Sequence, residues 1–174
     1  MAKSEEVLSK RGILGGDFLM IFVTLGTQDK PFVRLLKMVS TIKSDEEIVV
    51  QAGYTEYHDE RLHICSYFPT AEFKEYMARA DVVISHGGVG SLITALDMGK
   101  KVLVCPRLSR YGEHQNDHQQ QIVDIFTAAK HVVELKEGCD INEELLKLAD
   151  FQPEPFVHNN AAFVAKMRNY LFNK

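Results

Sequence analysis

A glycine-rich turn between an expected strand and an expected helix has the residue types that bind anions. An apolar, β-branched run at residues 81–86 ends at His86. The turn after it consists of small residues, Gly87, Gly88, Val89, Gly90 and Ser91. Free N–H groups at the start of a helix attract phosphate, and glycines let a ligand approach the backbone closely. We therefore interpret residues 85–91 as a phosphate-binding turn, with a tight turn that binds nothing as the alternative.

The spacing of these glycines differs from that of two common phosphate-binding motifs. The turn does not follow the dinucleotide pattern GxGxxG, and no GKS or GKT follows it, as a Walker loop requires. His86 has two interpretations of its own. It is either a polar group hydrogen-bonded at the sheet edge or a side chain that faces a phosphate or a sugar hydroxyl.

A second polar stretch, at residues 106–121, follows another apolar run. Its charged and polar side chains are Arg107, Arg110, Glu113, His114, Asn116, Asp117, His118 and Gln119. Such a mixture can hydrogen-bond a polyhydroxyl group, and the alternative is a solvated start of a helix. His114 and His118 are four residues apart, as metal ligands on a helix are, but no third ligand is evident. We therefore predict no metal site.

A third polar loop lies at residues 24–32, again directly after an apolar run. Gly26 and Thr27 offer a backbone N–H and a hydroxyl to a ligand at this position. The alternative is an ordinary turn in which Thr27 or Asp29 caps the following helix.

The elements that must position these loops alternate along the chain. Apolar runs predict strands at 20–26, 47–53, 61–68, 81–86, 101–106 and 131–135. Helical spacing of apolar residues predicts helices at 30–42, 69–80, 90–99, 113–129, 141–150 and 156–172. This alternation predicts an α/β fold, a single Rossmann-like domain whose parallel sheet has helices on both faces. The three polar loops then meet at the carboxyl ends of the strands, where ligands bind in such sheets.

Composition limits the class of protein. The 174 residues fit one domain, are 45% hydrophobic and carry a formal net charge of -4. Without a basic surface, nucleic-acid binding is not expected. Cys65, Cys105 and Cys139 are far apart and form no CxxC motif, which favours a reducing, cytoplasmic setting.

The N-terminal residues are not expected to belong to the domain. No apolar run reaches the roughly 18 residues that a spanning helix needs. We expect residues 1–19 to be a leader or a disordered extension, with a native helix as the alternative, and residues 20–174 to form the domain.

Three motifs in order resemble a known family. They are VTLGTQ, YFPTAEFKEYMARADVVISHGGVGS and PRLSRYGEHQNDHQ, which lie between residue 20 and about residue 135. This pattern resembles the C-terminal, donor-binding half of GT-B glycosyltransferases of the family-28 type. Within that family it is similar to split enzymes, namely the catalytic subunit of the eukaryotic dolichol-linked UDP-GlcNAc transferase and bacterial exopolysaccharide and capsule subunits of the PssE type. The PR…YGEH…DHQ stretch favours the bacterial subunits.

The resemblance implies roles in binding a UDP-sugar donor. The backbone of Phe68 would meet the uracil, and residues 87–91 would meet the diphosphate. Asp117 and Gln119 would lie near the donor sugar, and Gly26 and Thr27 would face the reaction centre. Many relatives carry a glutamate that binds the ribose where this chain has Thr94, so ribose binding would weaken or shift to Asp97.

The implied reaction moves a hexose from a UDP-sugar to a hydroxyl of a lipid-linked acceptor, in exopolysaccharide or capsule biosynthesis. The start of a helix and backbone donors can stabilise the departing UDP without a metal, and the chain has no DxD motif. His86 and His114 are the candidate general bases, together with Thr27 at the reaction centre. A base supplied by a partner is the alternative.

A complete GT-B enzyme has two Rossmann-like domains, and this chain resembles one. The resemblance therefore implies a membrane-anchored partner subunit that binds the acceptor and recruits this cytoplasmic chain to the inner face of the membrane. The expected helix at 156–172 either contacts that partner or packs on its own domain. The remaining alternatives are a non-catalytic nucleotide-sugar-binding module and another UDP-sugar enzyme, such as one with an epimerase-like fold.

Overall fold

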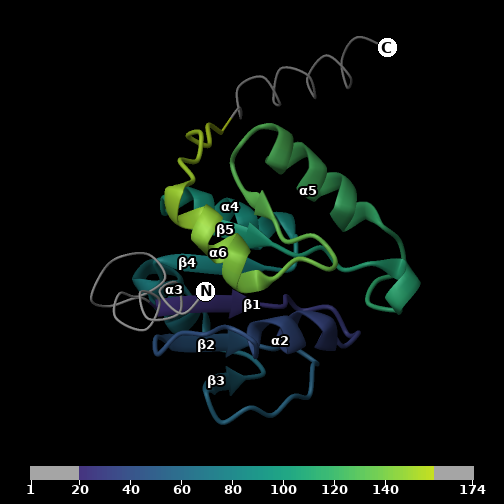
Figure 1. The fold of residues 1–174 in the computed structure, drawn as a ribbon. Helices are drawn as coiled ribbons and strands as arrows, with labels where there is room; N and C mark the ends of the chain where they lie inside the picture. The colour runs from purple at the N-terminus through teal and green to yellow at the C-terminus, as the bar shows by residue number, and fades with distance from the viewer. Residues whose placement is uncertain (1–19, 159–174) are drawn as a thin grey trace, which may run out of the picture.

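The computed structural model describes residues 20–158 of the chain. In this part six parallel strands form one sheet with helices on both faces (Figure 1). The strands are β1 (Met20–Thr24), β2 (Glu47–Gln51), β3 (Leu62–Cys65), β4 (Val82–Ser85), β5 (Lys101–Val104) and β6 (Val133–Glu134). Their order across the sheet is β3-β2-β1-β4-β5-β6. The predicted α/β class, with a parallel sheet covered on both faces, is confirmed.

The sheet divides the core into two layers, and helices cover each layer. The helices are α2 (Val33–Val39), α3 (Thr70–Arg79), α4 (Val89–Asp97), α5 (His118–Ala128) and α6 (Ile141–Asp150). Leu36 of α2 and Leu145 of α6 pack on one face of the sheet. Met77 of α3, Leu92 of α4 and Val123 of α5 pack on the other. Strand β1 lies between β2 and β4 and has one core layer on each of its faces, so every one of its residues is buried.

The last residues of three neighbouring strands form a polar row. Thr24 ends β1, and the strand register pairs it with Gln51 at the end of β2 and with Ser85 at the end of β4. Because side chains in register on parallel strands point to the same face, this row faces the layer of α3 and α4, like Phe22 two residues earlier. The loops that follow these strands start from one edge of the sheet.

One predicted helix start and one predicted helix cap are wrong. The helix expected at 113–129 begins only at His118, after a 3₁₀ turn at Ser109–Tyr111 and a left-handed Gly112. The side chain of Glu113 is bonded elsewhere, so the chain folds back before the helix begins. In α3 the N-cap is Pro69, and Thr70, expected as a possible cap, is already helical and makes no capping bond.

The start of α2 also departs from the alternative in which Thr27 or Asp29 caps it. Its N-cap position is Phe32, and the backbone N–H of Phe32 donates to Thr55 Oγ1 at 2.9 Å, so a different loop caps this helix. Residues 156–158 are not helical, and the rest of the helix predicted at 156–172 lies outside the described residues, as do residues 1–19.

One fully buried cation joins the loop after β1 to the loop after β5. Arg107 Nη2 donates to Leu25 O at 2.8 Å, and Nη1 donates to Lys30 O at 2.7 Å and to Glu113 O at 3.2 Å. The guanidinium also lies 4.8 Å from the ring centroid of Phe32. Burial lowers the pKa of Arg107 to about 10, so the side chain stays charged at neutral pH. These bonds fix the spacing of the two loops.

An ion pair next to it attaches α2 to the same loop. Arg34 Nε and Nη2 donate to the two carboxylate oxygens of Glu113 at 3.0 Å and 2.8 Å. Glu113 Oε2 also accepts the backbone N–H of Leu108 at 3.1 Å. A paired, bidentate arrangement of this kind holds geometry more strictly than a single contact does.

Replacing Arg107 tests this bracing. We expect Arg107→Met to lower the free energy of unfolding by about 3 kcal/mol, because buried carbonyls lose their donors. The control Arg110→Met, in the same loop, removes an exposed pair with Glu137 and should cost at most about 1 kcal/mol. Urea denaturation of both variants measures the difference. Equal losses would show that Arg107 does not brace the loops.

Candidate functional site

A cavity of about 440 Å³ opens at the carboxyl ends of β1, β2 and β4. Seven of the residues predicted from sequence line it: Gly26, Thr27, Phe68, His86, Gly88, Gly90 and Ser91. They come from the loops after β1 and β4, from the first turn of α4 and from the segment before α3. The strand order explains the gathering, because β1 lies between β2 and β4.

The start of α4 faces this cavity with uncapped backbone. Its N-cap is Gly88, which has no side chain to accept a capping bond, and no acidic residue lies in the first turn. The first N–H groups of a helix have no partner within the helix, and they carry the positive end of its dipole. An anion is therefore the ligand that this end of the cavity fits.

Gly87 and Val89 do not line the cavity, although both belong to the predicted turn. Gly87 has φ +86, and a Cβ there would lie 3.0 Å from a side-chain carbon of Val123 in α5. Gly87 is therefore needed for the shape and packing of the turn. Val89 is the first residue of α4 and is exposed.

His86 is held between two glycines at the wall of the cavity. A Cβ on Gly26 or on Gly88 would lie 2.4 Å or 2.3 Å from its Nε2 atom, so only glycine leaves room for the ring. His86 Nδ1 lies 3.2 Å from the carbonyl oxygen of Thr24. Because a carbonyl can only accept, this contact places the proton on Nδ1 and a lone pair on Nε2.

The charge state of His86 follows from its burial. Burial lowers the pKa of His86 to about 4, the bond to Thr24 opposes this, and the charges of Arg107 and His114 lower it further. The imidazole is therefore neutral at pH 7. In this state Nε2 accepts a hydrogen bond or a proton and does not donate one.

Three residues predicted in the loop after β5 do not line the cavity. Gln119 Oε1 accepts the backbone N–H of Arg107 at 3.1 Å, and Asp117 Oδ1 accepts that of Ser109 at 2.8 Å. The hydrogen bonds from Ser109 lower the pKa of Asp117. His114 Nδ1 lies 3.0 Å from Asn116 O, within the same loop. In this conformation Asp117 and Gln119 bond to the backbone of the loop itself.

The residues considered for ribose binding also have other partners. Thr94 Oγ1 donates to Gly90 O at 2.8 Å within α4. Asp97 lies 2.7 Å from His158 Nε2, far along the chain. Neither residue lines the cavity.

Several lining residues were not expected from the sequence. Thr24, Gln51, Tyr67, Thr70 and Phe73 all line the cavity. The available signal for Thr24 and Gln51 was a polar residue at the last position of an otherwise apolar strand.

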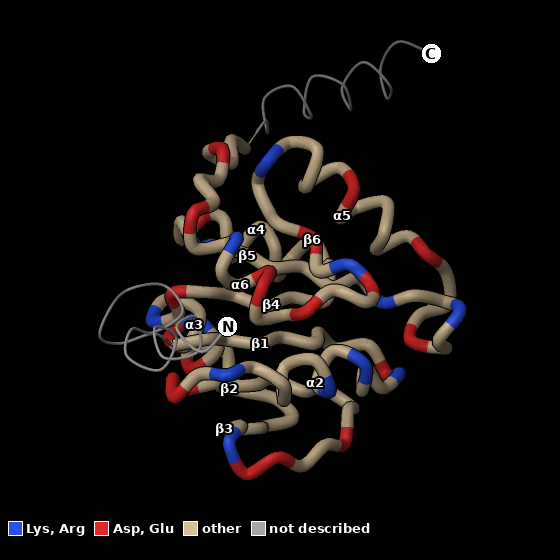
Figure 2. The backbone as a smooth tube through the Cα atoms, in the orientation of Figure 1, with Lys and Arg blue, Asp and Glu red and all other residues tan. Residues whose placement is uncertain are grey.

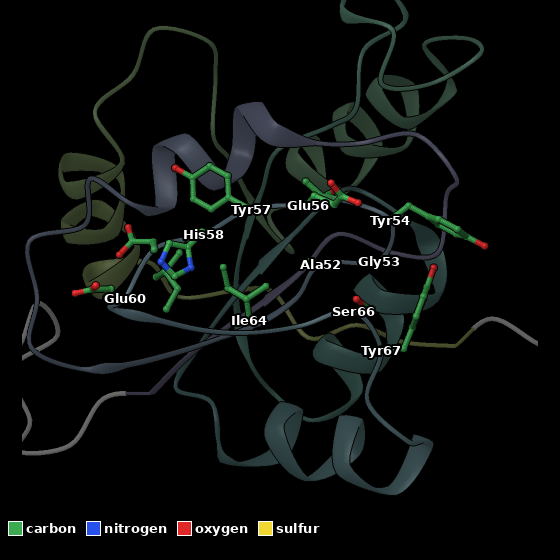
Figure 3. Close-up of a pocket in the computed structure, with 13 residues that line it drawn as sticks. Ala52, Gly53, Tyr54, Glu56, Tyr57, His58, Glu60, Ile64, Ser66 and Tyr67 are labelled. Atoms are coloured by element: carbon green, nitrogen blue, oxygen red, sulfur yellow. The ribbon is translucent and has the colours of Figure 1, made fainter.

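A second, larger cavity of about 750 Å³ lies beside the first, beneath the loop from β2 to β3 (Figure 3). Tyr67 lines both cavities. Figure 3 shows Tyr54 and Tyr67 at one end of this cavity and His58 and Glu60 at the other. The two tyrosine rings meet edge to face, with centroids 6.0 Å apart. Tyr67 therefore forms a wall between the two cavities.

Acidic and basic residues are interspersed along the part of the chain from residue 20 to residue 158 (Figure 2). Within it, no three His, Cys, Asp or Glu side chains are grouped as metal ligands would be. None of its helices has both the length and the apolar composition to cross a membrane.

Most of this chain matches one known protein family. Residues 20–171 match the model of the glycosyltransferase family 28 C-terminal domain. The chain belongs to this family. The resemblance seen in the three sequence motifs is thereby confirmed, and the family-28 domain includes every cavity residue named above.

Individual relatives agree with this assignment. The UDP-N-acetylglucosamine transferase subunit ALG13 of Kluyveromyces lactis is 33% identical in an alignment of 97 residues, and the match covers 50% of this chain and 47% of that protein. The chain thus spans about half the length of this curated relative.

Solved structures of low identity share the fold of this family-28 domain. The solution structure of ALG13 has a TM-score of 0.55 at 20% identity, over 86% of this chain and 94% of that one. The calicheamicin glycosyltransferase CalG4 has a TM-score of 0.60 at 14% identity, over 77% of this chain and 34% of that one. The family-28 domain therefore corresponds to about a third of this longer glycosyltransferase.

The pKa of His86 leads to a pH prediction. In the unfolded chain a histidine takes up a proton near pH 6.5, whereas folded His86 does so only near pH 4. Protonation therefore favours the unfolded state as the pH falls through this range. We expect the wild-type chain to lose more thermal stability over this range than His86→Gln, which has no such proton to take up. Melting curves against pH measure this, and parallel curves for the two proteins would contradict it.

Proposed function

We propose that this chain is the donor-binding, catalytic subunit of a two-chain glycosyltransferase. It moves a hexose from a UDP-sugar to a hydroxyl of a lipid-linked acceptor, in exopolysaccharide or capsule biosynthesis. The observation that carries the proposal is the cavity in which the uncapped start of α4 lies beside a glycine-flanked histidine, within a family-28 domain. The name of the K. lactis relative, a UDP-N-acetylglucosamine transferase subunit, supports a UDP-sugar donor.

The proposed donor position follows from the chemistry of the lining. The diphosphate lies at the first turn of α4, where backbone N–H groups and the hydroxyl of Ser91 are available. The uracil lies at Phe68, on the β2 side of the cavity. The sugar extends toward the loop after β5, where Asp117 and Gln119 would have to exchange loop contacts for sugar hydroxyls.

In the proposed reaction, an acceptor oxygen forms a bond to the anomeric carbon of the sugar. The bond from that carbon to the diphosphate oxygen breaks, and its electron pair leaves with UDP. The helix dipole and backbone donors of α4 stabilise this charge, so the proposal requires no metal. The proton of the acceptor hydroxyl goes to a general base.

His86 is the general base that we favour in this chain. Its Nε2 lone pair lies between Gly26 and Gly88, at the wall of the proposed diphosphate site. A pKa of about 4 makes the imidazole a weak base, but a bound diphosphate raises this pKa through its negative charge. His114, in the loop after β5, is the second candidate, and Thr27 is placed to hydrogen-bond the reacting groups.

We assign acceptor binding to a second subunit. The family-28 match covers one domain, whereas the longer glycosyltransferase CalG4 matches this chain over only 34% of its length. We propose that a separate, membrane-anchored subunit binds the lipid-linked acceptor and recruits this chain to the cytoplasmic face of the membrane.

Replacing either of two glycines that have similar backbone angles tests the proposed donor site. Gly26 has φ +75 and Gly138 has φ +78, so replacement by alanine strains both, but only at Gly26 does the new Cβ collide with His86. We expect Gly26→Ala to weaken UDP binding by about tenfold or more, because the wall of the cavity must move. Gly138→Ala should bind UDP like the wild type. Calorimetric titration measures both, and a wild-type chain that retains no UDP would refute the proposed function.

The second test concerns the partner. The isolated chain should bind UDP yet show little transfer, because it lacks the acceptor-binding half. Co-expression with the membrane subunit and a radiolabelled panel of UDP-sugars should restore transfer to the lipid fraction. Full activity of the chain alone would contradict the two-chain proposal. UDP binding without transfer in the complete complex would identify a non-catalytic module, and release of a free epimerised sugar would identify a different UDP-sugar enzyme.

A further inference from the structure

We propose that Gln51 selects uracil over cytosine in the proposed nucleotide cavity. This inference rests on the proposed function and adds to it a residue that reads the base. It is carried by one side-chain bond, from the backbone N–H of Phe68 to Gln51 Oε1 at 3.1 Å, at the edge of the cavity.

This bond is the last link between the segments that follow β2 and β3. The backbone N–H of Ala52 donates to Cys65 O, and that of Gly53 donates to Ser66 O, both at 2.9 Å. Figure 3 shows Gly53 close to Ser66 and Tyr67. Beyond Tyr67 the chain turns into α3, and there the Gln51 side chain takes the place of a backbone acceptor.

The bond determines how the Gln51 carboxamide is oriented. A backbone N–H can only donate, so the atom that meets it is the carbonyl oxygen, and Nε2 is the other end. Gln51 is 7% exposed and lines the cavity. No acceptor among residues 20–158 is bonded to Nε2, and this nitrogen is not among the fully buried polar atoms that lack a partner. The amide hydrogens of Gln51 are therefore available to a ligand.

Phe68 supplies the complementary group. Its ring packs against Tyr76 and Phe22, with centroids 4.7 Å and 6.3 Å away, so the ring is held by the aromatic cluster. Its N–H is already bonded to Gln51, and no group in the described chain donates to its carbonyl oxygen. Phe68 can therefore offer a base only an acceptor, and the Gln51 side chain bonded to its N–H offers a donor.

A donor next to an acceptor matches uracil and opposes cytosine. Uracil presents a donor at N3 and an acceptor at O4, whereas cytosine presents an acceptor at N3 and a donor at N4. The Phe68 carbonyl can accept from uracil N3–H while Gln51 Nε2 donates to O4. With cytosine, the Phe68 carbonyl would meet a second acceptor at N3, and Gln51 Nε2 would meet a second donor at N4. A buried polar group left without a partner is costly.

The neighbour of Gln51 in the sheet is a second polar residue that lines the cavity. Thr24 pairs with Gln51 in the strand register, is fully buried and also lines the cavity. Its hydroxyl has no hydrogen-bond partner within the described residues.

The test is the ratio of the dissociation constants for CDP and UDP. Gln51→Glu keeps an acceptor for the Phe68 N–H but loses the donor. Its new negative charge weakens both nucleotides alike, so their ratio is insensitive to the charge. We expect the wild type to prefer UDP by about tenfold or more, and Gln51→Glu to reduce this preference to about threefold or less. Gln51→Met, which is uncharged, should reduce it as well and serves if the glutamate variant does not fold.

The control is Gln152→Glu, the same change at an exposed position outside the cavity, which should keep the wild-type preference. Melting curves of all variants establish that they are folded. If the wild type binds UDP and the folded Gln51 variants keep its preference over CDP, or if the wild type has no preference, the inference is overturned. A wild type that binds neither nucleotide would instead refute the proposed function.

Discussion

The geometry of the candidate site depends on a single buried guanidinium. Arg107 donates to carbonyls from the loop after β1 and from the loop after β5, and without a cation these oxygens would face one another unpaired. Its own backbone N–H is bonded to Gln119, so the start of α5 is tied to the same residue. A charge removed from water is costly, and here several well-oriented carbonyls offset that cost. These bonds thereby set the spacing of the two loops.

The wall of the cavity is closely packed around His86. Gly26 and Gly88 approach the His86 ring from two sides, closer than any side chain would permit. The Thr24 carbonyl sets the ring orientation, and burial keeps it neutral. The bond to Thr24 thus fixes Nε2 as the His86 nitrogen that lies between Gly26 and Gly88.

The fold could be predicted because its signals are local. Apolar, β-branched strands such as 81–86 and helices such as 141–150 have distinct periods, and their alternation determines the class. The turn at residues 86–91 was found for the same reason, since glycines there stand out from the sequence. Strand order was not predictable, because it depends on which strands pair rather than on any single strand.

The parts of the site that were missed depend on partners far away in the sequence. A glutamine ending a strand is an ordinary residue until Phe68, in a different loop, is seen to donate to it. Conversely, Glu113, Asp117 and Gln119 were expected as polar groups for a ligand, and the structure bonds them to Arg34, Ser109 and Arg107. Composition shows that a polar side chain needs a partner, and only the fold shows whether that partner is the protein itself.

The start of α4 presents backbone N–H groups without a capping side chain, and this has an evolutionary consequence. Amide groups of the backbone persist through almost any amino-acid replacement, provided that the helix still begins at the same place. The outer loops of such a domain can therefore change in sequence while the backbone donors at the start of α4 are kept.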